Sequence, residues 1–161
     1  MTDFEDWYRR ERPMVLSACL ALAGNLDAAR EATDEAFTRA FERWETVGAM
    51  GAPGAWTQTV ALNYLRRRLR RRPLLRVFRV GRHDVAAPEV PDLELWQSVR
   101  RLPARQQTAV VLRYVHDLSY EQIAEAMNIS MGAVASTLNA AHRNLARPAS
   151  SAEPNEEKVD G

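Results

Sequence analysis

The sequence predicts an all-α protein made of two small helical domains joined by a flexible linker, of which the C-terminal domain is a helix-turn-helix. Three observations support this prediction. Apolar residues recur at helical spacing along most of the 161 residues, no strand-like alternation is present, and a proline-containing stretch without periodicity divides the chain. The expected parts are the domain 1–72, the linker 73–91, the domain 92–147 and a disordered tail, 148–161.

In the first domain, three helices follow from stop and start signals. The first helix ends at Gly24-Asn25, a C-terminal stop signal, and Asp27 is the expected cap of the second. The apolar stripe of the second helix includes Phe41. A third helix begins near Pro53, where a missing N–H costs nothing, and runs into an arginine-rich segment.

In the second domain, the predicted helices span residues 93–102, 104–116, 119–127 and 131–146. Ser119 and Gln122 have the spacing of a capping box at the start of the third of these helices. A three-residue turn separates it from the last helix. Capping box, turn length and apolar spacing favour a helix-turn-helix whose second helix reads the major groove, and a plain helical hairpin is the alternative.

The composition excludes several classes of protein. Apolar residues make up 46% of the chain and charged residues 27%, as in folded soluble proteins. The single cysteine, Cys19, excludes an internal disulfide framework and a cysteine-cluster zinc site. The three histidines lack the spacing of metal ligands, so no cofactor is expected.

Residues 14–23 form a short apolar stretch that could be mistaken for a secretion signal. The residues before it carry four acids against three arginines, whereas a signal needs positive charge there. No run approaches the ~18 apolar residues of a membrane-spanning helix. We therefore interpret the stretch as a buried helix with Cys19 in the core, and we expect a cytoplasmic protein without a membrane partner.

The net charge of +1 conceals a strongly basic block. Residues 1–45 carry six arginines against ten acids, a net −4; residues 46–83 carry nine arginines and no acid; and residues 84–161 carry seven basic against eleven acidic side chains, again −4. A basic block between acidic segments indicates one anion-binding surface, suited to nucleic acid or a membrane.

Almost the whole chain resembles a known family. The C-terminal half is similar to region 4 of bacterial RNA-polymerase sigma factors, closest to the extracytoplasmic-function class, and the N-terminal half is similar to region 2. The region 4 resemblance is carried by Leu102-Pro103-Ala104-Arg105-Gln106-Gln107, Val111-Leu112-Arg113-Tyr114, Asp117 to Glu125 and Gly132-Ala133-Val134. The region 2 resemblance is carried by Asp27-Ala28-Ala29, Glu35-Ala36-Phe37, Pro53-Gly54-Ala55-Trp56 and Ala61-Leu62-Asn63.

The resemblance implies that the third helix contacts promoter DNA. Melting a duplex needs cations along the phosphates and polar or aromatic groups that hold an extruded base. The candidate residues are Asn63, Tyr64, Arg66, Arg67, Arg70 and Arg71. The alternative is a solvated helix end whose cations suit the helix dipole, but nine arginines without an acid exceed what capping requires.

The last helix is similar to the family's recognition helix but is poor in cations. Its candidate DNA contacts are Ser130, Ser136, Thr137, Asn139, His142 and Arg143. The family commonly has Lys at the position of Ala135 and Arg at those of Thr137, Ala140 and His142. We therefore expect weakened reading of a minus-thirty-five element, because lost cations remove electrostatic affinity for DNA.

By the same resemblance, the second helix is the polymerase clamp. Its candidate contacts are Glu31, Asp34, Glu35 and Arg39. From periodicity alone, surface charge that keeps the protein soluble is the better explanation of these residues.

The leading hypothesis is a non-enzymatic sigma factor that binds core RNA polymerase and promoter DNA, with an anti-sigma factor as an optional partner. One alternative is a stand-alone helix-turn-helix regulator. Another is a sigma-like interaction protein with weakened promoter reading. We expect a monomer whose two modules move independently about residues 73–91, and no Gly-rich phosphate loop, metal cluster or nucleophile constellation points to an enzyme.

Overall fold

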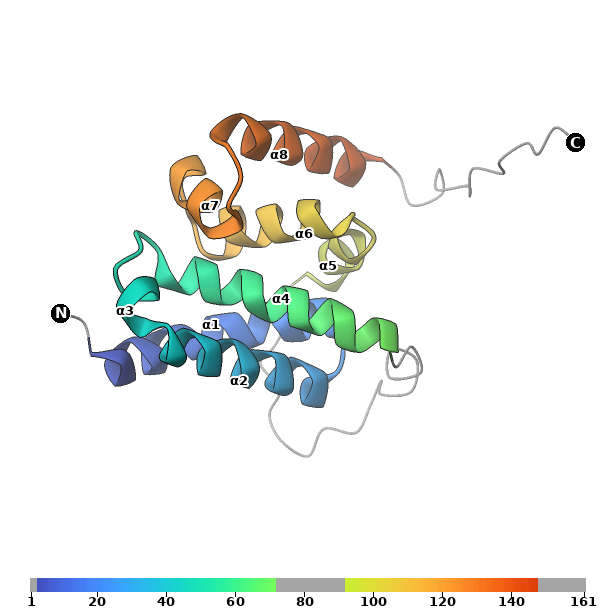
Figure 1. Cartoon of the computed structure of the whole chain (residues 1–161). Coiled ribbons are helices and arrows are strands. Elements are labelled where there is room, and N and C mark those ends of the chain that lie inside the picture. Colours follow the sequence, from blue (N-terminus) through green and yellow to red (C-terminus); the bar gives the residue numbers. More distant parts are fainter. Residues whose placement is uncertain (1–2, 72–91, 148–161) are drawn as a thin grey trace, which may run out of the picture.

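The computed structural model describes residues 3–71 and 92–147, and within these ranges the regular structure is entirely helical (Figure 1). The N-terminal module (residues 3–71) contains α1 (Phe4–Ala23), α2 (Leu26–Glu42), α3 (Trp44–Val47) and α4 (Pro53–Arg71). The C-terminal module (residues 92–147) contains α5 (Leu93–Arg100), α6 (Ala104–Val110), the π-helical turn η2 (Val111–Val115), α7 (Tyr120–Met127) and α8 (Met131–Ala146). The prediction of an all-α protein with two helical domains is confirmed, while the predicted linker and tail lie outside the described residues.

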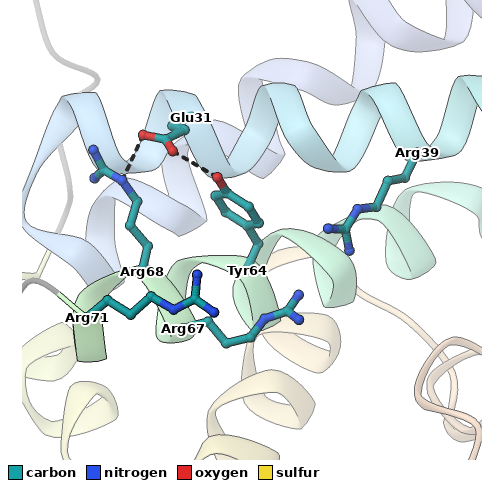
Figure 2. Close-up of a pocket in the computed structure, with 6 residues that line it drawn as sticks. All are labelled: Glu31, Arg39, Tyr64, Arg67, Arg68 and Arg71. Atoms are coloured by element: carbon teal, nitrogen blue, oxygen red, sulfur yellow. Dashed lines mark hydrogen bonds and ion pairs between the residues drawn. The ribbon is translucent and has the colours of Figure 1, made fainter.

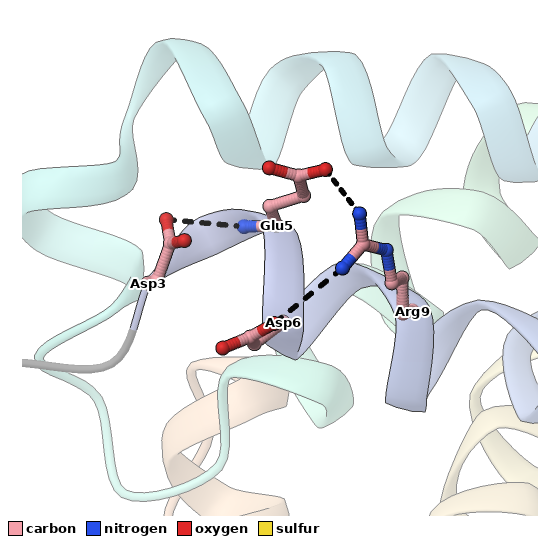
Figure 3. Close-up of polar contacts among 4 residues, drawn as sticks. All are labelled: Asp3, Glu5, Asp6 and Arg9. Atoms are coloured by element: carbon pink, nitrogen blue, oxygen red, sulfur yellow. Dashed lines mark hydrogen bonds and ion pairs between the residues drawn. The ribbon is translucent and has the colours of Figure 1, made fainter.

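A side-chain cap and a left-handed glycine define the two ends of α1. The Asp3 carboxylate accepts the backbone N–H of Glu5, and ion pairs join Arg9 to Glu5 and Asp6 one turn further on (Figure 3). The α1–α2 corner is made by Gly24, whose φ of 62° is in the left-handed region that suits glycine.

The cap of α2 is not the residue that we expected. The Asn25 side chain accepts the Ala28 N–H at 2.9 Å, whereas Asp27 lies in the first turn of the helix. Both Asn and Asp are good caps, and the sharp turn at Gly24 brings the first of them into the capping position.

The core of the N-terminal module lies between α1, α2 and α4. Cys19, Ala32 and Leu62 are buried there, and desolvation raises the pKa of the Cys19 thiol to about 12. Cys19 is therefore an inert core residue, as predicted. Small alanines on α2 let the helices approach closely, and a cluster of aromatic rings on α1, α2 and α3 closes one end of the module.

The C-terminal module is a helix-turn-helix supported by α5 and α6. The capping box of α7 is complete, because Ser119 Oγ accepts the Gln122 N–H at 3.2 Å and the Gln122 side chain accepts the Ser119 N–H at 3.0 Å. Asn128, with φ of 53°, ends α7 in the left-handed region. A single helix was expected over residues 104–116, but the segment becomes π-helical at η2. Arg113, within η2, donates to the Leu118 carbonyl.

The two modules pack against each other. Figure 1 shows α4 between the other N-terminal helices and the C-terminal module. The Arg100 Nε donates to the Ala21 carbonyl at 2.7 Å, and His116 Nε2 lies 2.8 Å from Gln58 Oε1. We expected modules that move independently, but in the structure they are in contact. Periodicity reveals which face of a helix is buried, not which module buries it.

Candidate nucleic-acid and polymerase interfaces

The arginine run of α4 points in several directions, because successive residues of an α-helix are rotated by about 100°. Arg67, Arg70 and Arg71 are exposed, as is Asn63. Among residues 3–71 and 92–147, none of these three arginines has an ion-pair partner. They form an exposed cationic ladder that is suited to phosphates.

Arg66 points toward the C-terminal module instead. Its guanidinium donates to Ala104 O at 2.9 Å, to Thr108 Oγ1 at 2.8 Å and to Gln107 Oε1 at 3.2 Å. It also donates to Asn63 Oδ1 at 3.1 Å. Burial lowers the pKa of Arg66 to about 10, so the side chain remains charged at neutral pH. Its donors are occupied within the protein in this arrangement.

A polar cleft of about 480 Å³ separates α2 from the end of α4 (Figure 2). Glu31 lies on its wall, where its carboxylate accepts the Tyr64 hydroxyl at 2.8 Å and pairs with Arg68 Nε at 2.7 Å. The hydrogen bond to Glu31 raises the pKa of Tyr64, because a phenolate would face a carboxylate. The remaining cleft residues are Arg39, Arg67 and Arg71. Residues assigned to DNA and to polymerase thus share one cleft.

The acidic face of α2 borders a second groove, of about 480 Å³. Asp34 lines it and accepts from Arg12 Nη2 at 3.2 Å. Glu35 lies one residue on and accepts from Arg39 Nε at 2.9 Å. The other lining residues are Phe4, Tyr8, Phe37, Thr38 and Phe41. Of the four residues on α2 that the sequence assigned to polymerase, Glu31 and Arg39 line the cleft beside Tyr64 and Asp34 lines this groove. Glu35 lines neither and pairs with Arg39.

Phe41 is the residue of this groove that sequence reasoning missed. We placed it in the inward stripe of α2, but its side chain is 63% exposed. The ring has an edge-on contact with Phe4, at 5.0 Å between centroids, and is otherwise open. The four-residue spacing places Phe41 on the same face of α2 as Phe37. However, α1 begins at Phe4 and so covers only part of that face. Aromatic side chains are enriched in protein–protein interfaces, so an exposed ring on this surface favours a protein-binding role.

The outer face of α8 presents Ser136, Asn139 and Arg143, all exposed, while Val134 and Leu138 are buried. Arg143 is the one cation among these three. The other candidate contacts have structural partners or lie on the flanks. The Ser130 side chain caps α8 by accepting the Ala133 N–H at 3.0 Å, and Thr137 is half-buried.

His142 is exposed, but its ring contacts the rest of the module. Its Nε2 lies 2.6 Å from the Tyr114 hydroxyl. Both residues line an apolar pocket of about 440 Å³ together with Trp96 and Leu145. In the arrangement seen, the imidazole therefore supports the packing of α8 on η2.

Neither described range contains a helix with the length and apolar character needed to cross a bilayer. Residues 3–71 and 92–147 also hold no group of three His, Cys, Asp or Glu side chains that could bind a metal ion.

An exposed cationic ladder on one helical module and a helix-turn-helix on the other define a two-module DNA-binding protein. Comparisons with known families agree: residues 7–73 match the family described as "Sigma-70 region 2", and residues 92–145 match "Sigma-70, region 4". The chain belongs to the sigma-70 family of RNA polymerase sigma factors, in the extracytoplasmic-function class.

Similar proteins carry matching names. The chain is 27% identical over 150 residues to the RNA polymerase sigma-E factor of Streptomyces coelicolor, an alignment that covers 90% of this chain and 83% of that protein. It is 26% identical over 151 residues to the ECF RNA polymerase sigma factor SigW of Bacillus subtilis, covering 82% and 79%. The sigma factor RpoE of Bartonella quintana, solved in complex with the anti-sigma factor NepR, shares the fold with a TM-score of 0.67 at 20% identity, over 90% of this chain and 95% of that one.

Proposed function

We propose that this sigma factor attaches to core RNA polymerase through α2 and engages promoter DNA chiefly through α4. The observation that carries the proposal is the cationic ladder of Arg67, Arg70 and Arg71, which is exposed and has no acidic partner within the described residues. Each guanidinium can contact a phosphate without first breaking an ion pair, so the ladder supplies sequence-independent affinity.

The groove beside Asp34 and Phe41 is the proposed attachment site for polymerase. It combines an exposed aromatic ring with a carboxylate that is 62% exposed. Aromatic residues contribute strongly to binding when a partner covers them, and a carboxylate at the edge selects a basic partner. The groove lies on the helix that the family resemblance assigned to the clamp.

The C-terminal module contributes less to promoter affinity in this proposal. The outer face of α8 offers two neutral polar side chains and Arg143, so few phosphates can be neutralised there. This observation also favours a second candidate function, a sigma-like interaction protein that binds polymerase without reading promoters. A stand-alone regulator is less well supported, since its cations belong on the recognition helix.

The protein acts in the cytoplasm, as a transcription factor rather than an enzyme. An anti-sigma factor is retained as an optional partner; the related fold of RpoE was solved with one, NepR.

Run-off transcription with core polymerase on genomic fragments tests the proposal. The wild-type protein should give discrete transcripts that core polymerase alone does not give. A variant with Arg67, Arg70 and Arg71 changed to Gln should still co-purify with core polymerase but give few transcripts. Binding to polymerase without initiation by the wild type would support the interaction protein instead.

A further inference from the structure

We propose that the polar cleft between α2 and α4 binds a small molecule that carries a chain of two or more phosphates, and that this ligand competes with DNA for Arg67 and Arg71. The competition rests on the proposed function of α4 and adds a diffusible ligand to it. The basis of the inference is that guanidiniums from two helices surround one cleft (Figure 2).

The charges around the cleft are unbalanced. Of the six described residues that line it, four are arginines and one, Glu31, is an acid. Glu31 pairs with Arg68, whereas Arg67 and Arg71 have no ion-pair partner among residues 3–71 and 92–147. These two arginines are four positions apart on one face of α4, so their like charges repel each other. An anion with at least two negative charges would neutralise both of them.

Two residues of the cleft wall are held in place without a ligand. The Glu31 carboxylate accepts the Tyr64 hydroxyl and pairs with Arg68 Nε, which fixes both side chains. Arg68 also has an unused donor, because its Nη1 is buried and lacks a hydrogen-bond partner within the described part of the chain. A buried donor without an acceptor costs free energy, and a phosphate oxygen in the cleft would relieve that cost.

Arg39 adds a cation from the opposite helix. Its guanidinium carbon lies 6.0 Å from the centre of the Tyr64 ring, and its Nε donates to Glu35 at 2.9 Å. The Arg39 side chain is 39% exposed. Such a solvated ion pair contributes little stability, so Arg39 can turn toward a phosphate at small cost. A ligand in the cleft is therefore contacted from α2 and from α4, unlike a phosphate that rests on α4 alone.

The size of the cleft favours a small ligand over a duplex. Its volume of about 480 Å³ is in the range of small-molecule sites. A duplex is too wide to enter, since its major groove alone is about 12 Å across. DNA can reach the exposed Arg67 and Arg71 from outside, but a phosphate chain inside the cleft would occupy the same two guanidiniums. Arginine forms strong paired hydrogen bonds with phosphate, which makes phosphates the preferred anions.

The test uses the residues that distinguish the cleft from the cationic ladder. Arg39→Gln removes a cation of the cleft that is outside the ladder. Arg70→Gln removes a cation of the ladder that is not among the described residues lining the cleft. Glu31→Gln removes the acid of the cleft, so it should strengthen anion binding where the other changes weaken binding. All variants are made in the full chain.

Two measurements are made on each variant. Isothermal titration calorimetry with inorganic pyrophosphate, and separately with adenosine diphosphate, reports affinity for a phosphate chain without and with a nucleoside. Sulfate at the same ionic strength is the control for attraction of any anion. Fluorescence anisotropy with a labelled DNA duplex reports DNA affinity in the presence of pyrophosphate or of sulfate, again at equal ionic strength.

We expect the wild type to bind pyrophosphate about tenfold more tightly than sulfate. Arg39→Gln should weaken pyrophosphate binding about tenfold and keep the duplex affinity, whereas Arg70→Gln should weaken duplex binding and keep the pyrophosphate affinity. Glu31→Gln should bind pyrophosphate more tightly than the wild type does. Tighter binding of adenosine diphosphate would identify the ligand as a nucleotide, and equal binding would identify a bare phosphate chain.

Pyrophosphate should also compete with DNA. At about twice its dissociation constant it should weaken duplex binding by the wild type about threefold relative to sulfate. The same concentration should have much less effect on Arg39→Gln, because that variant binds the duplex normally but pyrophosphate weakly.

Equal affinities for sulfate and pyrophosphate, or equal losses of pyrophosphate binding in Arg39→Gln and Arg70→Gln, would overturn the site, because the arginines would then attract any anion. No pyrophosphate binding by the wild type and by Glu31→Gln would also overturn it, while duplex binding would leave the proposed function intact. Pyrophosphate binding without an effect on the duplex would overturn the competition. A wild type that binds pyrophosphate but no duplex would overturn the proposed role of α4 and support the cleft.

Discussion

Tyr64 on α4 donates its hydroxyl to the Glu31 carboxylate on α2 at 2.8 Å, and the same carboxylate pairs with Arg68. These two contacts join α4, the helix proposed to contact DNA, to α2, the helix proposed to bind polymerase. Glu31 therefore acts within the protein as the anchor of Tyr64 and Arg68. The neighbouring cleft residues Arg67 and Arg71 have no ion-pair partner among residues 3–71 and 92–147.

Glu31→Gln should strengthen DNA binding, because it frees the positive charge of Arg68 beside the cationic ladder. We expect higher affinity for a DNA duplex at low salt and a salt slope steeper by up to about 0.9. Glu42→Gln, at the exposed C-terminal end of the same helix, removes an equal charge outside the cleft and serves as the control. A slope equal to that of the wild type would show that Arg68 stays out of reach of phosphates.

The cationic ladder should account for most of the salt dependence of DNA binding. Changing Arg67, Arg70 or Arg71 singly to Gln should lower the log–log salt slope by about 0.9 each. Arg66→Gln should lower it less in the full chain, since Arg66 is already occupied by α6. Anisotropy across a salt series measures all four variants, and an equal effect of Arg66 would argue against the arrangement seen.

Phe41→Ala and Asp34→Arg should each weaken the complex with core polymerase. Truncating a ring that is covered in a complex costs about 2 kcal/mol when it is an anchor residue, or nearly thirtyfold in affinity. Co-purification and titration with core polymerase give the affinities. Glu45→Arg, an exposed charge reversal on α3, is the control that should bind as the wild type does.

Adding a cation to the outer face of α8 should raise DNA affinity. Asn139→Arg places a guanidinium between Ser136 and Arg143 on the exposed face, where a surface change costs less than about 0.5 kcal/mol of stability. A phosphate contact would raise affinity on every sequence, whereas a bidentate contact with guanine adds about 1–3 kcal/mol on selected sequences. Anisotropy with several duplexes separates the two outcomes. No gain on any duplex would mean that this face does not approach DNA.

The free energy of unfolding should fall between pH 7 and pH 5 because of His116. Burial lowers the pKa of His116 to about 4, from 6.5 in an exposed histidine. Below pH 6.5 the unfolded chain therefore binds a proton that the folded chain does not, so stability declines as pH falls. The loss at pH 5 amounts to about 2 kcal/mol.

Urea unfolding at pH 7 and at pH 5 measures this loss of stability. The variant His116→Gln should lose less stability between the two pH values, because it lacks the contribution of His116. The two proteins differ in this one imidazole, so the difference between them isolates His116 from the carboxylates that titrate in the same range. Equal pH dependence in both proteins would show that His116 is protonated without cost.

Much of the local structure follows from the sequence, because helix signals act over a few residues. The capping box at Ser119 and Gln122, the end of α1 at Gly24 and the burial of Cys19 all follow from spacing and residue type. The two-domain division and the helix-turn-helix follow from the same kind of local information, together with the family motifs.

The roles of individual side chains depend on what the helices pack against. Helical periodicity gives the angle at which Arg66 leaves α4, but only the docking of α6 supplies its three acceptors. The same reasoning applies to Phe41, which α1 leaves largely uncovered, and to His142, which Tyr114 engages. The sequence by itself therefore determined the helices, their caps and the composition of each face. The tertiary structure decided which cations remain available, because that depends on contacts between residues roughly 30 to 40 positions apart, which no local pattern encodes.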